Sequence, residues 1–270
     1  MSKIFCLILN YNRRDDTVNC AHSLLASRLP AGTQIIVIDN GSKDLRAFFS
    51  RQIKNSLYIK SPGNIGFAAG NNQGIRYALK HGATHILVIN PDVIVPKDFL
   101  LPLLRLNKDL VAPAHTEGSG SYGLGGRIDW RLCSFPHDNV TKLPINPRRY
   151  DLLTFACVLI KREVFETVGL MDERYFLYLE DVDYCVTVAR AGFSLYLDPS
   201  VVVTHATSSS FSDPRGKIKY SFKSSFIFIR KWYLFPGSIL PILHTLYFYP
   251  YLYLLWTLKI WKRQIWHPVI

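Results

Sequence analysis

The first half of the chain alternates short runs of β-branched and apolar residues with longer amphipathic stretches, and this alternation restricts the fold more than any other feature. Strands are expected at residues 4–9, 34–38, 57–59 and 85–89, with helices near 17–27, 45–53 and 67–81 between them. Strands that alternate with helices form βαβ units around a parallel sheet. The pattern therefore predicts an α/β fold with a mostly parallel sheet flanked by helices.

Each of these four strands runs into polar or glycine-rich residues. The four clusters are Asn10-Tyr-Asn12, Asp39-Asn-Gly-Ser42, Ser61-Pro-Gly-Asn64 and Asn90-Pro-Asp92. Ligands of open parallel sheets bind beyond the carboxyl ends of the strands. We therefore expect the four clusters to meet at one crevice.

Two of the clusters suggest a nucleotide and a metal. The carboxylate of Asp39 can accept the N3–H of a uracil or thymine ring, although an Asx turn explains the same residue. Asp92 follows an apolar strand and can hold Mg²⁺ or Mn²⁺ against diphosphate oxygens, although it can equally be the turn residue after a proline-ended strand. The glycine-rich stretch 62–74 has neither the dinucleotide spacing nor the lysine of a P-loop. Gly66 can present free N–H groups at a helix start, or can merely allow close packing.

A third cluster of acids lies further along the chain. The segment Phe176-Leu-Tyr-Leu-Glu-Asp-Val-Asp183 places three carboxylates in the first turn of an expected helix. Acids there complement the helix dipole, and one that faces a cleft can act as a general base of raised pKa. His205 ends the last expected strand, where a lone histidine is more often structural than a ligand.

The middle of the chain changes character. Residues 116–149 are rich in glycine, serine and proline, which predicts a flexible loop or a hairpin that covers the site. A strand at 152–160, a helix at 162–168, a helix from Glu180 and a strand pair at 194–197 and 201–204 are expected to complete a domain of residues 1–212.

The last segment, residues 213–270, is basic and aromatic. From Arg215 onward the chain has nine Lys or Arg and no Asp or Glu, within a whole-chain charge of +12, and residues 232–258 carry no formal charge. Three prolines interrupt the apolar stretch, and four tryptophans suit an interfacial depth. An in-plane helical attachment to an anionic membrane is predicted; a true membrane span and a buried helical subdomain are the alternatives. The apolar surroundings of these cations favour a membrane over nucleic acid.

Cysteine usage and the N-terminus point to one compartment. The five cysteines form an odd set without a C-x-x-C pair, which argues against disulfides and structural zinc. The run from Lys3 to Asn10 reads as a buried strand and not as a signal peptide. We therefore expect the protein at the cytoplasmic face of the inner membrane, attached peripherally.

In their order and spacing these stretches resemble glycosyltransferase family 2, which has the GT-A fold, and in particular bacterial rhamnosyltransferase-type members that build surface polysaccharide such as O-antigen. The resemblance runs from about residue 3 to 207. It rests on Leu9-Asn-Tyr-Asn12, Val37-Ile-Asp-Asn-Gly-Ser42, Gly63 to Asn72, Ile89-Asn-Pro-Asp-Val93, Arg162-Glu-Val-Phe165, Gly169 to Asp183, Ala191-Gly192 and Thr204-His205.

The resemblance implies a role for each matching residue. Asp181 would be the catalytic base, while Glu180 and Asp183 would shape the acceptor site. Asp92 takes the last position of the family's D-x-D-like metal motif, with Asn90 at its first position, and His205 would be a further metal or diphosphate contact. The implied donor-binding residues are Asn10, Asn12, Asp39, Asn64, Gly66, Asn71 and Asn90. Phe155 departs from the small residue common in relatives, which affects the expected sugar pocket or acceptor approach.

The implied reaction is an inverting, Mg²⁺- or Mn²⁺-dependent transfer from a nucleoside-diphosphate sugar to a hydroxyl of a lipid-linked glycan. Rhamnose from dTDP-rhamnose is the first expectation for the donor, and a UDP-linked hexose or galactofuranose is the alternative. A sugar nucleotidyltransferase is disfavoured because Asn10-Tyr-Asn-Arg-Arg14 replaces the glycine-rich basic loop it would need. A catalytically silent membrane assembly protein is the alternative from another class.

Overall fold

The computed structural model describes residues 2–42, 44–116, 118, 120–205 and 214–266. One mixed sheet forms the centre of the molecule, with its main strands in the order β3-β2-β1-β4-β10-β6-β11-β5. Their bounds are β1 Ile4–Asn10, β2 Gln34–Asp39, β3 Leu57–Lys60, β4 His85–Ile89, β5 Val93–Ile94, β6 Leu110–Thr116, β10 Cys157–Lys161 and β11 Leu195–His205. Strands β3, β2, β1 and β4 are parallel, and β6 is parallel to β11. These relations confirm the predicted α/β fold.

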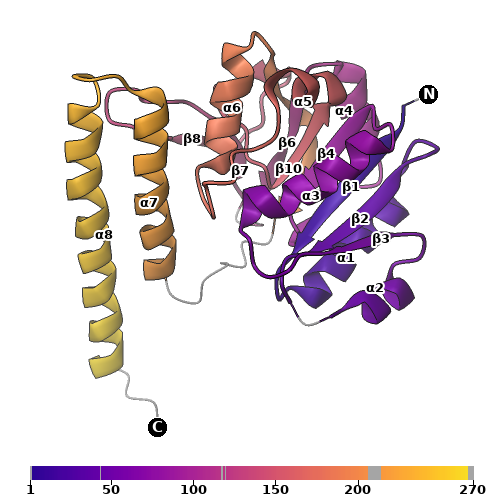
Figure 1. Cartoon of the computed structure of the whole chain (residues 1–270), viewed down its shortest axis with the longest axis horizontal. Helices are drawn as coiled ribbons and strands as arrows, with labels where there is room; N and C mark the ends of the chain where they lie inside the picture. Colours follow the sequence, from indigo (N-terminus) through magenta and orange to yellow (C-terminus); the bar gives the residue numbers. More distant parts are fainter. Residues whose placement is uncertain (1, 43, 117, 119, 206–213, 267–270) are drawn as a thin grey trace.

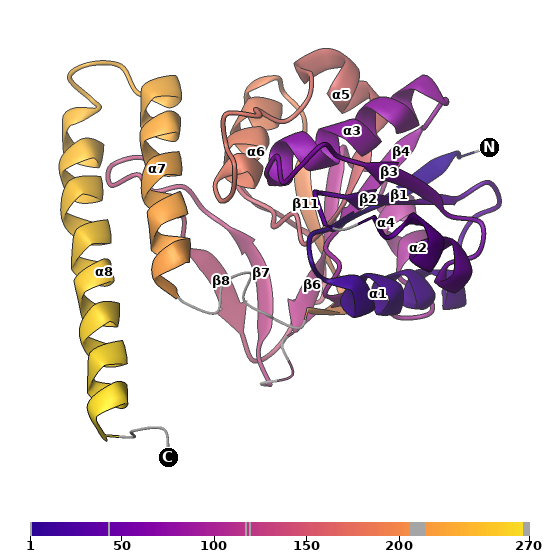
Figure 2. The same ribbon diagram turned by 60° about the horizontal axis from the view of Figure 1, so that its bottom comes forward.

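Helices cover both faces of the sheet because successive residues of each strand point to opposite sides. Ile4, Cys6 and Ile8 of β1 pack in one core with residues of α1, α2 and α4, whereas Phe5 and Leu7 pack in the other with α3, α5 and α6. The helices are α1 Arg14–Ala26, α2 Arg46–Gln52, α3 Phe67–Lys80, α4 Leu100–Leu106, α5 Arg162–Val168 and α6 Glu180–Arg190. Figures 1 and 2 show the two helical layers with the sheet between them.

The second half of the sheet differs from the expected strands in three ways. Strand β6 was not predicted, although it supplies the pairing edge for both β10 and β11. The strand expected at 152–160 begins only at Cys157, because Leu152 forms just an isolated bridge with Gly126. The expected strand pair is one strand, β11, whose register against β6 shifts between Asp198 and Val202.

The glycine- and proline-rich middle segment forms a hairpin. Strands β7 (Tyr122–Gly126) and β8 (His137–Val140) pair antiparallel, and β9 (Arg148–Arg149) pairs with β11. The hairpin alternative for this segment is therefore correct for its described residues. Residues 117 and 119 lie outside the description.

Two long helices form the C-terminal part of the described chain. Helix α7 (Pro214–Trp232) lies between the sheet domain and α8 (Ile239–Trp266), and Figures 1 and 2 both show α8 on the outer side of α7. Within the described residues, neither of these helices nor any other reaches the length and apolarity required to cross a bilayer. The expected domain boundary at residue 212 falls in 206–213, outside the described residues.

Candidate active site

A cavity of about 650 Å³ opens at the carboxyl ends of β1 and β4, where the polar clusters were expected to meet. Its wall also includes the turn before α3, the segment that leads into α6, and the start of α7. Seven of the predicted site residues line it: Asn64, Gly66, Asn90, Asp92, Phe155, Glu180 and Asp181. Six others lie outside the lining: Asn10, Asn12, Asp39, Asn71, Asp183 and His205.

Two neighbouring carboxyl groups face this cavity at the start of α6. Burial raises the pKa of Asp181, while the Val182 N–H, which donates to Asp181 Oδ1 at 2.8 Å, and the nearby His137 act in the opposite direction. Burial raises the pKa of Glu180 well above its ordinary value, and the charge of Asp181 adds to the effect. Among the described residues, no donor reaches Glu180 Oε2. The pair therefore holds a proton at higher pH than free carboxyl groups do.

The backbone that presents these acids is strained. Tyr178 and Leu179 have φ angles of 67° and 66°, in the left-handed region that side chains rarely adopt. Such a conformation costs about 1–3 kcal/mol for each residue and is concentrated at functional sites. The strain aims the first turn of α6, with its acids, into the cavity.

Asp92 and His205 lie together although they are far apart in sequence. Strands β5 and β11 pair antiparallel with His205 opposite Val93, which brings His205 Nε2 within 3.2 Å of Asp92 Oδ1. Both side chains are more than four-fifths buried, with 18% and 14% of their surface exposed. A carboxylate and an imidazole at this spacing suit Mn²⁺ or Mg²⁺.

The protein donors at this point do not enclose a metal ion by themselves. Across the described chain, no three His, Cys, Asp or Glu side chains gather as a ligand set. Mg²⁺ characteristically binds through one or two carboxylates and completes its shell with water and substrate phosphates. An ion between Asp92 and His205, open to the cavity, fits that mode.

Asp39 lies behind the cavity wall in a polar cluster of its own. Its carboxylate is fully buried and accepts hydrogen bonds from the Tyr58 hydroxyl at 2.6 Å and from Asn10 Nδ2 at 3.2 Å. The Ser42 N–H donates to the same carboxylate at 3.1 Å, and Lys60 Nζ lies 3.9 Å from it. A contact between Asp39 and a nucleobase stays a prediction, since three donors already use this carboxylate.

Asn40 connects that cluster to the cavity surface. Its Nδ2 donates to Asn64 Oδ1 at 3.1 Å and to the Gly66 carbonyl at 3.0 Å, and all three residues line the cavity. Gly66 has a φ of 89°, and a Cβ there would come within 2.5 Å of the Phe176 carbonyl oxygen. Only glycine allows this close approach of the two loops.

The remaining predicted donor-site asparagines have structural partners. Asn71 is fully buried, and its Nδ2 donates to the Phe67 carbonyl at 3.1 Å within α3, whereas among the described residues no donor reaches its Oδ1. Asn12 is exposed with a φ of 54°, and its N–H donates to Ser42 Oγ at 2.9 Å. Phe155, in contrast, lines the cavity and packs edge-to-face on Tyr184 at 5.9 Å between ring centroids.

A comparison with known protein families identifies the family of the chain that forms this cavity. A model of the family described as glycosyl transferase family 2 matches residues 6–169, more than half of the chain. The chain belongs to glycosyltransferase family 2. The match includes the strand-end clusters and Asp92, and it ends before the acids of α6. It confirms the resemblance that the sequence motifs indicate.

The names of similar proteins agree with this assignment. The chain is 28% identical to the low-salt glycan biosynthesis hexosyltransferase Agl10 of Haloferax volcanii over 70% of this chain and 62% of that protein. It is 23% identical to the dTDP-rhamnosyl transferase RfbF of Shigella flexneri, over 76% and 69% of the two chains. A shorter stretch, 33% of this chain and 29% of the relative, is 36% identical to the N-acetylglucosaminyl-diphospho-decaprenol L-rhamnosyltransferase of Mycobacterium tuberculosis.

A solved structure has a fold similar to that of this chain. The mannosyltransferase PcManGT of Pyrobaculum calidifontis, in complex with GDP-Man and Mn²⁺, superposes with a TM-score of 0.63 at 14% identity. The superposition covers 99% of this chain and 76% of that one. At this identity the similarity concerns the fold alone.

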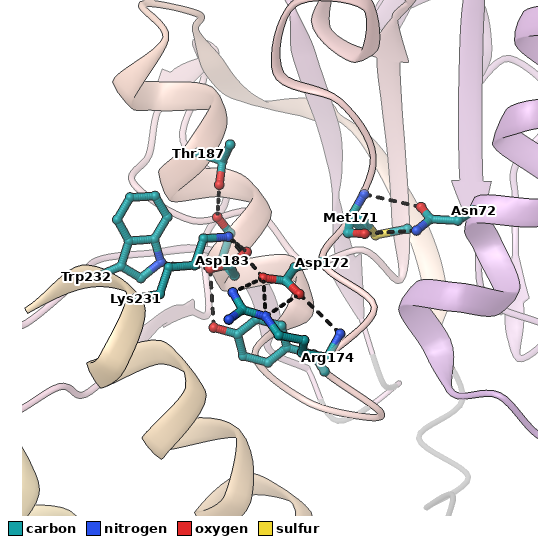
Figure 3. A network of polar contacts seen from close by, with 9 residues as sticks. Asn72, Met171, Asp172, Arg174, Asp183, Thr187, Lys231 and Trp232 are labelled. Atoms are coloured by element: carbon teal, nitrogen blue, oxygen red, sulfur yellow. Dashed lines mark hydrogen bonds and ion pairs between the residues drawn. The ribbon is translucent and has the colours of Figure 1, made fainter.

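The third acid in the first turn of α6, Asp183, lies outside the cavity lining. Asp183 accepts hydrogen bonds from Lys231 Nζ and from Trp232 Nε1, both at 2.7 Å, and from the Tyr175 hydroxyl at 3.2 Å. Figure 3 shows Lys231 and Trp232 of α7 converging on this carboxylate. Asp183 therefore fastens α6 to α7, and its predicted acceptor-site role stays a prediction.

Several residues that the sequence analysis did not select line the same cavity. They are Tyr11, Arg13, Asn40, His137, Tyr178, Lys217 and Tyr220. Tyr11, Arg13 and Asn40 lie inside or beside the predicted clusters, so their position along the chain could have identified them. No local pattern marks His137, Lys217 or Tyr220, which reach the cavity from β8 and α7.

Proposed function

We propose that this family 2 chain is an inverting glycosyltransferase that moves rhamnose from dTDP-rhamnose to a hydroxyl of a lipid-linked glycan, at the cytoplasmic face of the inner membrane. The observation that carries the proposal is the meeting of two different functional groups at one cavity. The acids Glu180 and Asp181 lie on its wall, and so does Asp92, which pairs with His205.

In this mechanism Asp181 acts as the general base. A base is most effective when its pKa lies near the working pH, and burial moves the pKa of Asp181 upward in that direction. As the acceptor oxygen attacks the anomeric carbon, Asp181 takes the hydroxyl proton. The nucleoside diphosphate departs from the opposite face, so the configuration at that carbon inverts.

Asp92 and His205 would hold Mg²⁺ or Mn²⁺, with Asn90 beside them on the cavity wall. When bound, such an ion neutralises charge that develops on the departing diphosphate. Arg13 lines the same cavity and adds a second positive group. The cavity thus has a proton-accepting side at Asp181 and a diphosphate-binding side at Asp92 and His205.

The donor assignment draws on the relatives. The Shigella and Mycobacterium relatives are named for dTDP-rhamnosyl or L-rhamnosyl transfer, which favours rhamnose, whereas the Haloferax relative is named only as a hexosyltransferase. A UDP-linked hexose therefore stands as the alternative donor. An N3–H contact to Asp39 would serve uracil and thymine equally.

A lipid-linked acceptor and an anionic membrane are supported by α8. Six apolar side chains repeat along α8 at spacings of three and four residues and are all more than 40% exposed: Leu240, Leu243, Tyr247, Tyr251, Leu254 and Leu258. Apolar residues at this spacing form one continuous helix face. The basic residues of the same hairpin would attract anionic headgroups. The Mycobacterium relative is named for a diphospho-decaprenol acceptor.

A nucleotide panel tests the proposal. The thermal stability of the full chain is measured with dTDP, UDP, GDP and ADP, each with and without Mn²⁺, because a ligand of the native state raises apparent stability. A metal-dependent increase with dTDP, together with transfer of rhamnose from dTDP-rhamnose, is expected. A response to UDP alone would select the UDP-sugar alternative. A folded sample that responds to no nucleotide would favour the silent assembly protein.

A further inference from the structure

The start of α7 forms part of the cavity wall. Lys217 and Tyr220 both line the cavity, and three residues apart on a helix they project from the same side. This helix belongs to the C-terminal hairpin that also exposes the apolar face of α8. The hairpin therefore adds side chains to the site itself.

Lys217 brings a positive charge to the segment that leads into α6. Its Nζ lies 5.7 Å from the centre of the Tyr178 ring, two residues before Glu180. None of the ion pairs among the described residues includes Lys217, whereas Arg13, another cation of the cavity wall, lies 3.3 Å from Asp16. The ammonium group of Lys217 is thus available to an anion that enters the cavity.

The aromatic rings around Lys217 are held in place from both sides. Tyr220 stacks on Phe176 with 5.2 Å between ring centroids and 18° between planes. Ser224 Oγ of α7 donates to the Leu177 carbonyl at 3.1 Å, and the Phe176 carbonyl accepts the Phe67 N–H at 2.8 Å. The segment that carries Tyr178 is therefore clamped between α7 and α3, and the subsite exists before any ligand binds.

We propose that Lys217, with Tyr178 and Tyr220, forms a binding subsite for a phosphate group of the acceptor, separate from the site of the donor diphosphate. This inference rests on the proposed function. Lysine binds phosphate as a mobile point charge, and a phenol can donate a further hydrogen bond. Burial, with the neighbouring Glu180, raises the pKa of Tyr178 to about 12, so its hydroxyl keeps its proton.

The position of Lys217 selects the acceptor over the donor as the source of the phosphate. Lys217 lies over the ring of Tyr178, and Tyr178 belongs to the segment that leads directly into Glu180 and Asp181. The proposed diphosphate site lies instead at Asp92 and His205, on the sheet edge. An acceptor with its hydroxyl at Asp181 and its phosphate at Lys217 would leave its lipid beside the apolar hairpin.

The test uses farnesyl diphosphate as a short lipid diphosphate and farnesol as its neutral counterpart. Both are titrated against the full chain with dTDP and Mn²⁺ present at saturation, so that the donor site is filled. Farnesyl diphosphate is expected to bind and farnesol to bind much more weakly. Lys217→Ala should weaken farnesyl diphosphate binding by about 10- to 100-fold, the range for a lost hydrogen bond to a charged group.

Two variants control for folding and for general charge. Lys217→Arg keeps the charge and should keep most of the affinity. Lys219→Ala removes an exposed lysine two residues further along α7, whose Nζ lies 5.7 Å from the Tyr253 ring on α8, and should change affinity less than about twofold. Equal melting temperatures of the three variants would show that the fold is intact.

Other results overturn the inference. It fails if wild type does not bind farnesyl diphosphate, if Lys217→Ala binds it as wild type does, or if dTDP with Mn²⁺ displaces it. It also fails if Lys217→Ala weakens dTDP binding instead, because the cation would then serve the donor. Failure of the proposed function looks different: wild type would show no nucleotide response, while the loss of farnesyl diphosphate binding in Lys217→Ala would still establish the anion subsite.

Discussion

Glu180 and Asp181 are adjacent carboxyl groups on the cavity wall. Their side-chain chemistry is the same, but their exposure and hydrogen bonds differ. Glu180 is 5% exposed and has an oxygen that no described donor reaches, whereas Asp181 is half-buried and accepts the Val182 N–H. A buried carboxyl without donors favours its neutral form. Asp181, which is partly exposed and accepts a hydrogen bond, is the better candidate for the charged base.

Asp181→Asn is therefore expected to lower transfer by about 10²- to 10⁴-fold, the usual contribution of a general base. The asparagine has nearly the same shape, so the thermal shift with dTDP and Mn²⁺ should stay as in wild type. Transfer is measured by single-turnover product formation. Full activity in this variant would contradict the role of Asp181 as base.

Glu180→Gln tests the buried acid through stability. The folded-state pKa of Glu180 is raised above the value of about 4.3 for an unfolded chain, so ionising Glu180 disfavours the fold. Below the unfolded pKa both forms are neutral and the two proteins should melt together. As pH rises above it, the variant should become increasingly more stable than wild type until Glu180 is ionised in the fold. A melting series from about pH 4 to 8 measures the difference, and a constant difference would contradict the assignment.

His205→Ala tests the proposed metal site at Asp92 and His205 without changing Glu180 or Asp181. Removal of one of the two proposed metal ligands should eliminate the Mn²⁺-dependent part of the dTDP thermal shift and keep the metal-free part. His115→Ala is the control, because it removes a neighbouring imidazole whose ring centroid lies 6.0 Å from that of His205. An unchanged metal response in His205→Ala would remove His205 from the site.

At the scale of elements, α6 and α7 are joined by a buried polar network. Lys231 lies 2.7 Å from Asp183 Oδ2 and 3.3 Å from Asp172 Oδ2, and Arg174 lies 2.6 Å from Asp172 Oδ2. Figure 3 shows these side chains gathered between the two helices. The hydrogen bond from Arg174 lowers the pKa of Asp172 to about 2, so this carboxylate stays ionised beside Lys231. The helix that carries the proposed base is thereby tied to the helix that carries Lys217.

Lys231→Met should lower the free energy of unfolding by about 2 kcal/mol, because Asp183 is 1% exposed and loses a charged partner. Arg230→Met, one residue earlier and on the exposed side of α7, should change it by less than about 0.5 kcal/mol. Urea unfolding of both variants provides the comparison. Equal stabilities would mean that the network does not hold α7 in place.

At the scale of the molecule, the α7–α8 hairpin has two different sides. Phe228 of α7 packs into the main core, with Phe135 at 5.1 Å and Trp130 at 6.0 Å between ring centroids. The outer face of α8 is apolar and exposed, beyond α7 in Figures 1 and 2. One hairpin thus lines the cavity with side chains of α7 and exposes an apolar face on α8.

The double variant Leu243→Asp and Tyr247→Asp should therefore reduce flotation with vesicles of phosphatidylglycerol and phosphatidylcholine. These side chains are 57% and 69% exposed, so their replacement removes apolar contact with lipid while the fold is kept. Leu25→Asp on α1, where the side chain is 47% exposed, is the matched control and should float as wild type does. Equal flotation of all three proteins would contradict membrane attachment through α8.

The sequence by itself determined the parallel half of the fold and its ligand-binding edge. Strand and helix periodicities are local, and the carboxyl ends of parallel strands meet at one edge wherever they occur, so Asn64, Asn90 and Asp92 could be assigned to the cavity in advance. The first turn of α6 was equally predictable as the place of the acids.

Only the tertiary structure decided which distant segments complete the site. The β7–β8 hairpin with His137, which pairs with β6, and α7 with Lys217 reach the cavity through long-range pairing and packing that no local pattern encodes. The meeting of His205 with Asp92 likewise depends on the antiparallel pairing of β11 with β5. Asp39 and Asn10 lie behind the wall because Tyr58 and Ser42 bind them there, and such competition among buried polar partners is resolved only when the chain is packed.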